Sequence, residues 1–357
     1  MKFLLLLLFF FSFSVPANAS EETNGLYDAL GKNEQEVLYE IGIESADYKD
    51  FLNLDIEKIF AFLGKKLKEE VKKPFEFAAQ TTAVLILYAA FMNMEKNCVE
   101  QTAKISCTLI CALLLIVPIS QYLERCAAVL SSSGKFLLSA SAVYSALLYM
   151  GGNVSFASSY SYISMLSGNV ISLVFSLIAN KGLNVFLSFS VISGLSDRFS
   201  LSKFCDFFYK AIKITLTFSI TVFTSILMVQ SAVFSGVDAA VIKTARFAVS
   251  SFVPAVGSAI SDAVTSVYSS AKLLRSGAGA FGILASIIIF APSLISYGIW
   301  KIMCTFTLFV SETFDMKNVS ILLKSAEKTL DIMAALLISC MAVIIIVSGV
   351  MLSLGKV

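Results

Sequence analysis

The sequence predicts an all-α fold, a polytopic transmembrane helical bundle with a small extracytoplasmic helical region at its N-terminus. Apolar residues make up 57% of the 357 residues and charged residues only 15%, whereas soluble domains usually carry about 25% charged residues. The apolar residues also gather in long runs, and a run of about 18 residues is enough for a membrane-spanning helix. Composition and patterning therefore agree on a membrane protein.

Residues 1–19 have the features of a secretory signal peptide. Lys2 provides a positive start, residues 3–15 an apolar core, and Ala17 and Ala19 an A-x-A cleavage site. The core has 13 residues, fewer than the roughly 20 that a spanning helix needs. We expect cleavage after Ala19 and a following segment outside the cytoplasm.

Residues 20–73 form a polar region that we expect to be a small extracytoplasmic helical cap. Apolar side chains recur at helical spacing within residues 56–71, and lysines between Lys65 and Lys73 lie on or beside the other face. Such a helix fits an anionic membrane surface. It fits equally well against the protein's own bundle, and the sequence leaves both interpretations open.

The membrane domain, residues 74–357, contains seven or eight predicted spans. They are residues 77–94, 105–123, 136–150, 159–178, 214–234, 278–300 with a continuation to 310, and 330–354, with residues 183–195 as half of a hairpin or a bent span. A mixed-charge, solvated loop is expected before the last span, formed by Glu312, Asp315, Lys317, Lys324, Glu327, Lys328 and Asp331.

The loop at residues 196–213 is predicted to face the cytoplasm. It holds four basic residues against two acidic ones, and basic loops favour the cytoplasmic side. Five spans counted from an extracytoplasmic start lead to the same side. Residues 238–276 then lie on the extracytoplasmic side or dip in from it.

The composition excludes several chemistries. The chain has no histidine, which removes Ser-His and Cys-His nucleophile pairs and HExxH zinc sites. It has no P-loop sequence, and a net charge of +2 gives no case for nucleic-acid binding. We expect no enzyme activity, no catalytic residue, no metal and no cofactor. Cys107 and Cys111 share a helix face and are interpreted as packing residues.

Residues 238–282 form a broken amphipathic segment between apolar runs. Pro254 removes a backbone donor and Gly257 adds freedom, so a kink or re-entrant turn is expected there. Glycines at 277, 279 and 282 predict a tight turn into the next span, followed by close packing. The polar face carries Ser251, Pro254, Ser258, Asp262, Thr265, Ser269 and Lys272, opposite a stripe that includes Val256 and Val264.

Two interpretations of this polar face stay open. Small residues and hydroxyls allow helix backbones to approach closely and to bond across the contact. Alternatively, the face lines a hydrated path in which Asp262 and Lys272 are polar landmarks. An acid at membrane depth costs about 2.5–3.5 kcal/mol on insertion scales, so Asp262 needs a partner or water.

Four short motifs in this segment carry a family resemblance. They are Lys243-Thr-Ala-Arg246-Phe247, Ser251-Phe-Val-Pro254-Ala-Val-Gly257, Ser261-Asp262-Ala-Val, and Gly277-Ala-Gly279 with Gly282. Together they resemble the stage III sporulation protein AE family, polytopic membrane proteins of spore-forming Firmicutes. The order of features agrees over nearly the whole chain. Ser258 departs from the pattern, since a second glycine is expected there.

The resemblance implies a non-enzymatic subunit of a channel or secretion-like complex in the mother-cell membrane that faces the forespore. The implied partners are other membrane proteins of the stage III sporulation A complex, a forespore-membrane partner and the lipid bilayer. The conduit supports late forespore development. The family also resembles permease-type exporters, so an autonomous small-solute permease is the alternative. A permease transports alone, whereas a subunit needs its companions.

Overall fold

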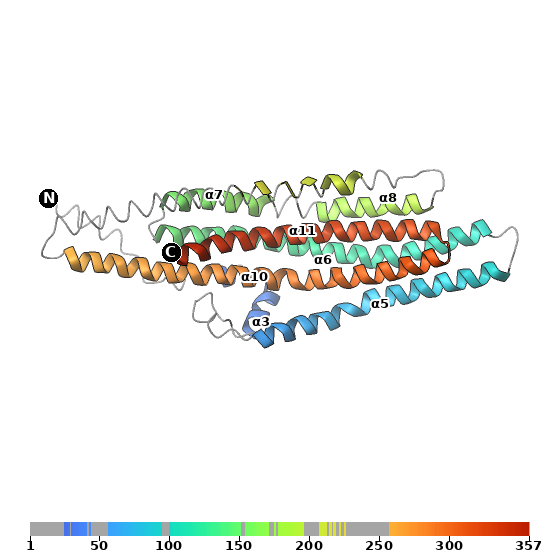
Figure 1. The fold of residues 1–357 in the computed structure, drawn as a ribbon, viewed down its shortest axis with the longest axis horizontal. Coiled ribbons are helices and arrows are strands. Elements are labelled where there is room, and N and C mark those ends of the chain that lie inside the picture. Colours follow the sequence, from blue (N-terminus) through green and yellow to red (C-terminus); the bar gives the residue numbers. More distant parts are fainter. Residues whose placement is uncertain are drawn as a thin grey trace.

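A computed structural model of the chain shows long helices lying side by side along one axis (Figure 1). It describes residues 25–28, 30–40, 43, 56–94, 100–150, 154–170, 175, 178–195, parts of 207–225, and 257–356. Every regular element within these residues is helical, which confirms the all-α prediction. The predicted signal peptide, most of the 20–55 region and residues 238–256 lie outside the described residues.

Four long helices make up the bundle: α5 (Ile56–Met94), α6 (Glu100–Met150), α10 (Gly257–Thr313) and α11 (Lys317–Lys356). α5 and α10 run in one direction, and α6 and α11 run in the other (Figure 1). Their lengths of 39 to 57 residues correspond to about 60–85 Å at 1.5 Å per residue, at least twice the ~30 Å of a bilayer core. Each contains an apolar stretch long enough to cross a membrane, so the chain is a multi-pass membrane protein.

Shorter helices cover the bundle. α7 (Val154–Val170) packs on α6, and α8 (Leu183–Leu195) packs on α11 and α6 after the π-helical turn η2 (Ile178–Gly182). α3 (Lys32–Glu40) contacts α10 from the other side (Figure 1). The predicted span at 159–178 is therefore shifted, because α7 begins at Val154 and ends at Val170. The described residues 207–212 are helical, so the end of the predicted loop at 196–213 is not a loop.

α6 joins the two spans predicted at 105–123 and 136–150 into one helix. The polar residues between them led the sequence pattern to suggest an interruption. In the structure, Arg125 of this stretch donates to Glu70 of α5, and Gln121, near the end of the first predicted span, accepts a hydrogen bond from Lys73 of α5. The helix continues through the stretch, so two expected spans become one element.

α5 likewise joins the basic part of the predicted cap to the first predicted span. The helix continues through Pro74, which lies inside it and is buried. A proline within a helix loses a backbone hydrogen bond and costs about 3 kcal/mol. Packing on α10 offsets this cost, since Phe77, three residues beyond the proline, contacts the ring of Trp300.

α10 and α11 form an antiparallel hairpin with the most extensive contact in the molecule. The connection is three residues long, and Asp315 takes a left-handed φ of 53°, a conformation that aspartate tolerates better than most residues. The hydroxyls of Ser311 and Ser320 meet across the hairpin at 2.8 Å. The mixed-charge loop prediction is therefore wrong, because Lys324, Glu327, Lys328 and Asp331 belong to α11.

Candidate functional site

The sequence motif of residues 243–282 lies partly outside the described residues. Lys243, Arg246, Ser251 and Pro254 are not described, so the expected break at Pro254 stays a prediction. Gly257 is the first residue of α10. The backbone of α10 is helical through the following motif residues: Ser258, Ser261, Asp262, Thr265, Ser269 and Lys272.

The three glycines of the motif do not form a turn. Gly277, Gly279 and Gly282 are buried within α10, whose helix is uninterrupted from its start to Thr313. The prediction of a tight turn at these glycines is therefore wrong. The backbone hydrogen bonds of a helix stay satisfied at membrane depth, whereas a turn there would expose them.

Gly282 lies where α6, α10 and α11 meet closely. A Cβ atom built on this glycine would collide with the hydroxyls of Tyr144 and Ser348. The Tyr144 hydroxyl donates to the Ala278 carbonyl at 3.2 Å and lies 3.1 Å from Ser348 Oγ. These buried hydroxyls connect three helices, and they fit because residue 282 has no side chain.

A cluster of polar side chains connects α10 to α11 further along the hairpin. We call it the Asp331 cluster: Tyr297, Lys301 and Thr305 from α10, with Glu327 and Asp331 from α11. Lys301 Nζ lies 3.0 Å from each oxygen of Asp331 and 4.0 Å from Glu327 Oε2. The Tyr297 hydroxyl donates to Asp331 at 3.0 Å, and the Thr305 hydroxyl donates to Glu327 at 2.5 Å.

The spacing within each helix places these groups on one face. Tyr297, Lys301 and Thr305 are four residues apart, as are Glu327 and Asp331, and residues four apart are neighbours on a helix surface. One lysine faces two carboxylates, which gives these three side chains a formal excess of one negative charge. Their exposed fractions are 31% for Lys301, 16% for Glu327 and 28% for Asp331, so the cluster is half-buried.

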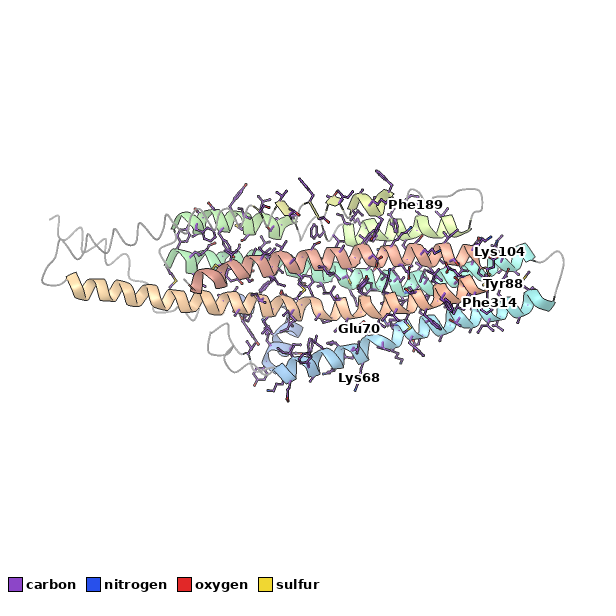
Figure 2. The ribbon with its side chains drawn as sticks, viewed as in Figure 1. Lys68, Glu70, Tyr88, Lys104, Phe189 and Phe314 are labelled. Carbon is purple, nitrogen blue, oxygen red and sulfur yellow. The ribbon has the colours of Figure 1, made fainter. Side chains whose placement is uncertain are left out.

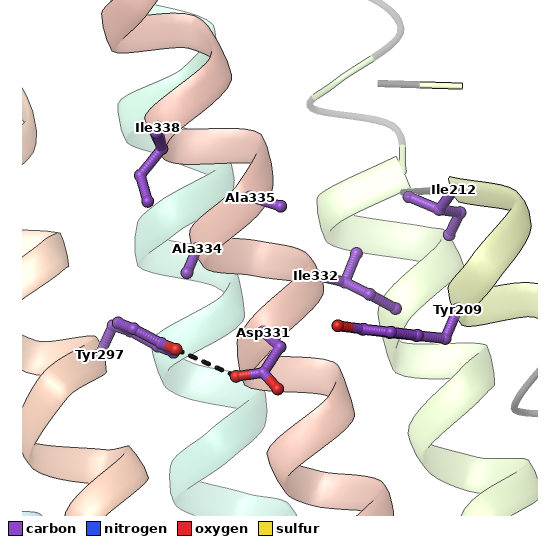
Figure 3. Close-up of a pocket in the computed structure, with 8 residues that line it drawn as sticks. All are labelled: Tyr209, Ile212, Tyr297, Asp331, Ile332, Ala334, Ala335 and Ile338. Carbon is purple, nitrogen blue, oxygen red and sulfur yellow. Dashed lines mark hydrogen bonds between the residues drawn. The ribbon is translucent and has the colours of Figure 1, made fainter. Parts of the chain in front are cut away.

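A small cavity of about 210 Å³ opens beside Asp331. Figure 3 shows Tyr297 and Tyr209 on opposite sides of it, each with its hydroxyl directed toward α11. Asp331 is the charged member of the lining, and Ala334 and Ala335 leave space next to it. The cavity is large enough for several water molecules. The arrangement can therefore hydrate Asp331 or bring a small polar solute or proton to it.

A second cluster ties the remaining long helices together at the same level. We call it the Glu70 cluster: Arg125 donates to Glu70 at 3.0 Å, and Ser296 donates to the other Glu70 oxygen at 2.8 Å. Ser296 directly precedes Tyr297 of the Asp331 cluster. All four long helices therefore carry charged groups at one level of the bundle, and each group has a partner from another helix.

The chemistry of these clusters is that of ion pairs and hydrogen bonds. The chain has no histidine to act as a general base beside a nucleophile. Within the described part of the chain, no group of three or more histidine, cysteine or acidic residues is placed to hold a metal ion. Half-buried ionisable side chains that meet between helices beside a cavity are candidates for a functional position. The Asp331 cluster is therefore the best candidate site among the described residues.

Sequence analysis missed this cluster although two signals for it were present. Lys301 is a single charge within an apolar run, and Glu327 and Asp331 share a helix face. Because Glu327 and Asp331 were predicted to lie in a solvated loop, their shared helix face was not recognised. With the turn placed at Phe314–Met316, Lys301 and Asp331 lie at nearly equal distances from it, and an antiparallel hairpin brings such residues together.

Comparisons with known proteins point to one family. The family model described as stage III sporulation protein AE matches residues 45–355, a range that contains the four long helices from residue 56 onward, both clusters and the 243–282 motif. Stage III sporulation protein AE of Bacillus subtilis (strain 168) is 20% identical over 216 residues, covering 59% of this chain and 54% of that protein. The alignment thus spans about half of the length of this relative. No solved structure matches the chain. Because the family model covers most of the sequence, the chain belongs to the stage III sporulation protein AE family.

Proposed function

We propose that this chain is a non-enzymatic membrane subunit of a channel or secretion-like complex that links the mother cell to the forespore. The observation that carries the proposal is the family match over residues 45–355. We place the protein in the mother-cell membrane that faces the forespore, where the complex is needed for late forespore development. Its partners are other membrane proteins of the stage III sporulation A complex and a partner in the forespore membrane.

The architecture supports a role within an assembly. The long helices exceed the thickness of a bilayer core about twofold or more, so parts of the bundle are available outside the membrane. Large apolar side chains are also exposed along them, including Leu87 on α5, Leu113 on α6 and Phe309 on α10, each more than 60% exposed. Such surfaces are covered by lipid or by neighbouring membrane proteins.

Tagged purification from sporulating cells tests the proposal. The tagged chain should bring down at least one other membrane protein of the stage III sporulation A complex in comparable amount. An unrelated polytopic membrane protein with the same tag is the control for non-specific capture. Recovery of the tagged chain alone, in a detergent that preserves its fold, contradicts the proposal.

The second candidate function is an autonomous small-solute permease. It is favoured by the Asp331 cluster, because an ionisable group beside a cavity is a common feature of transport pathways. Reconstitution of the purified chain in liposomes distinguishes the two functions. A subunit should give no solute flux by itself, whereas flux that disappears in Asp331→Asn would support the permease.

A further inference from the structure

A groove of about 510 Å³ runs along the outer surface between α5 and α10. Its α5 wall extends from Phe75 to Ile86, and its α10 wall includes Ile302 and Phe306. The lining is apolar except for the hydroxyl of Thr82. A groove of this chemistry, on a helix with exposed Phe75 and Ile86 side chains, accepts a hydrocarbon ligand.

Two lysines continue the face of α5 that forms this groove. Lys68 lies seven residues before Phe75, and Lys72 lies seven residues before Ala79, and residues seven apart lie on the same side of an α-helix. Both lysines are exposed, and neither forms an ion pair within the described residues. Figure 2 shows Lys68 on the outer edge of α5, with Glu70 on the edge that faces the bundle. Two exposed lysines of α5 therefore lie next to one end of the apolar groove.

Two other lysines of this stretch have partners, whereas Lys65 lies seven residues before Lys72 on the same side of α5. Lys66 pairs with Glu69 at 2.8 Å, and Lys73 donates to Gln121 of α6 at 3.4 Å. The basic residues of α5 also stop at Lys73, because residues 74–94 contain no lysine or arginine. Glu76 is the one charged residue of 74–94, and a change from a lysine-rich to a largely apolar stretch along one helix is typical of the boundary between lipid headgroups and the hydrocarbon core.

The dimensions of the groove fit one lipid chain. From Phe75 to Ile86 the helix rises about 16 Å, close to the ~15 Å of a single leaflet of a ~30 Å hydrocarbon core. The length of the groove therefore matches one acyl chain of a single leaflet, and the two lysines lie beyond one end of it.

We propose that this groove holds an acyl chain of an anionic phospholipid whose phosphate lies between Lys68 and Lys72. The lysines supply the attraction for the anionic headgroup, and the groove supplies a shaped surface for the chain. The ligand is a phospholipid of the surrounding bilayer, bound at one site in preference to the zwitterionic lipids around it. Lys66 and Lys73 have no part in the site.

Trp300 is a natural reporter for this site. It is the single tryptophan of the chain, it is 1% exposed, and its ring lies 5.6 Å from that of Phe77. It is only two residues from Ile302 of the groove wall. Bromine atoms on an acyl chain quench indole fluorescence at short range, so a brominated lipid in the groove should dim Trp300.

The experiment uses the purified full chain in phosphatidylcholine nanodiscs that contain a minor fraction of brominated lipid. Brominated phosphatidylglycerol should quench Trp300 more strongly than brominated phosphatidylcholine at the same fraction. Lys68→Gln with Lys72→Gln should reduce the apparent affinity for the anionic lipid by about fivefold for each lysine. The matched control, Lys66→Gln with Lys73→Gln, removes the same charge from the other side of α5 and should leave the preference intact.

The possible quenching results distinguish which molecule occupies the groove. Equal quenching by both brominated lipids, unchanged in Lys68→Gln/Lys72→Gln, would mean that only non-selective lipid covers the groove and would overturn the proposal. Absence of quenching by either lipid would mean that a second copy or another protein segment fills the groove, and would also overturn it. Ala79→Leu with Ala83→Leu fills the groove and should reduce quenching by both lipids. The Trp300 emission spectrum in unbrominated lipid shows whether each variant keeps its fold.

Discussion

Gly282 and Lys301 are two residues of α10 that are constrained by contacts with other helices. Gly282 matters because it lacks a side chain, which leaves room for the hydroxyls of Tyr144 and Ser348. Lys301 matters because it is the cation that two carboxylates of α11 share. Each residue controls a contact between helices. For each one, the same hairpin offers a control position at which the same kind of substitution should have little effect.

Gly282→Ala should destabilise the folded protein. The added methyl group meets two hydroxyls in a packed region, and overpacking of this kind typically costs about 1–3 kcal/mol. The measurement is the midpoint of thermal unfolding in detergent. Gly298→Ala is the control, because nothing lies within 4 Å of a Cβ atom at that position. If both variants unfold at the wild-type temperature, the close approach of α6, α10 and α11 at Gly282 is wrong.

Lys301→Met should weaken the α10–α11 hairpin by about 1–2 kcal/mol. This value lies between the 0–1 kcal/mol of an exposed pair and the 3–5 kcal/mol lost when one partner of a buried pair is removed, since the cluster is only half-buried. Lys324→Met is the control, because Lys324 and Glu312 form an exposed pair at 2.8 Å. A double-mutant cycle with Asp331→Asn measures the coupling, and additive effects would show that the two side chains do not interact.

At the scale of the element, α10 combines three roles along one continuous helix. Its first part carries the polar residues of the sequence motif, its middle part packs closely at Gly282, and its last part holds the Asp331 cluster. Pro292 lies inside α10, between Gly282 and the Asp331 cluster, and a proline within a helix removes one backbone hydrogen bond and favours a kink.

Leucine substitutions test the two-faced character of the first part of α10. Leucine at Ser258 or Ser269 should impair sporulation, because added volume blocks either close helix contact or a hydrated path. Leucine at Val264, on the apolar face, should be tolerated and is the matched control. Spore counts and membrane levels are the measurements. Equal tolerance at all three positions would show that the segment does not have two distinct faces.

Asp262→Asn separates the two interpretations of the polar face. An amide keeps hydrogen bonding but loses the charge, so a packing role predicts normal sporulation. A path that depends on charge predicts a sporulation defect with normal membrane levels and normal assembly. Loss of the protein from the membrane would instead indicate that the carboxylate is needed for folding.

At the scale of the whole molecule, four helices longer than a bilayer is thick are linked at one level by the Glu70 and Asp331 clusters. The described half of the bundle beyond Lys73 exposes large apolar side chains of α5, α6 and α10, including Leu87, Leu113 and Ile302. Lysines on α5 precede this surface along that helix. Large apolar side chains are also exposed on α7 at the other end of the bundle, including Tyr162 and Met165 (Figure 1), so the exposed apolar surface extends over both halves.

The orientation of the bundle is tested by labelling from outside the cell. After removal of the seven native cysteines, Ser45→Cys should react with an impermeant thiol reagent, whereas Ser200→Cys should react only in permeabilised cells. The physical reason is the basic excess of residues 196–213 together with the signal-like N-terminus. Labelling at position 200 and protection at position 45 would reverse the orientation.

Composition and local periodicity were enough to predict the membrane class and the helical fold, whereas the family resemblance came from short motifs within residues 243–282. A run of apolar residues in lipid must form a helix whatever its neighbours are, so these properties need no knowledge of distant contacts. The α8 helix, expected from an apolar run at 183–195, has the predicted bounds for the same reason. The absence of histidine is also a property of composition alone, and it limits the chemistry that any fold of this chain can support.

Which helices continue and which charges meet depends on tertiary contacts. The polar residues after 123 favoured an interruption of α6, but Arg125 among them pairs with Glu70 of α5 and the helix continues. Asp331 was assigned to a loop because its partner, Lys301, lies 30 residues away in the sequence. Local patterns record the preferences of neighbouring residues, whereas the cost of a charge in a helix depends on a partner that only the fold supplies.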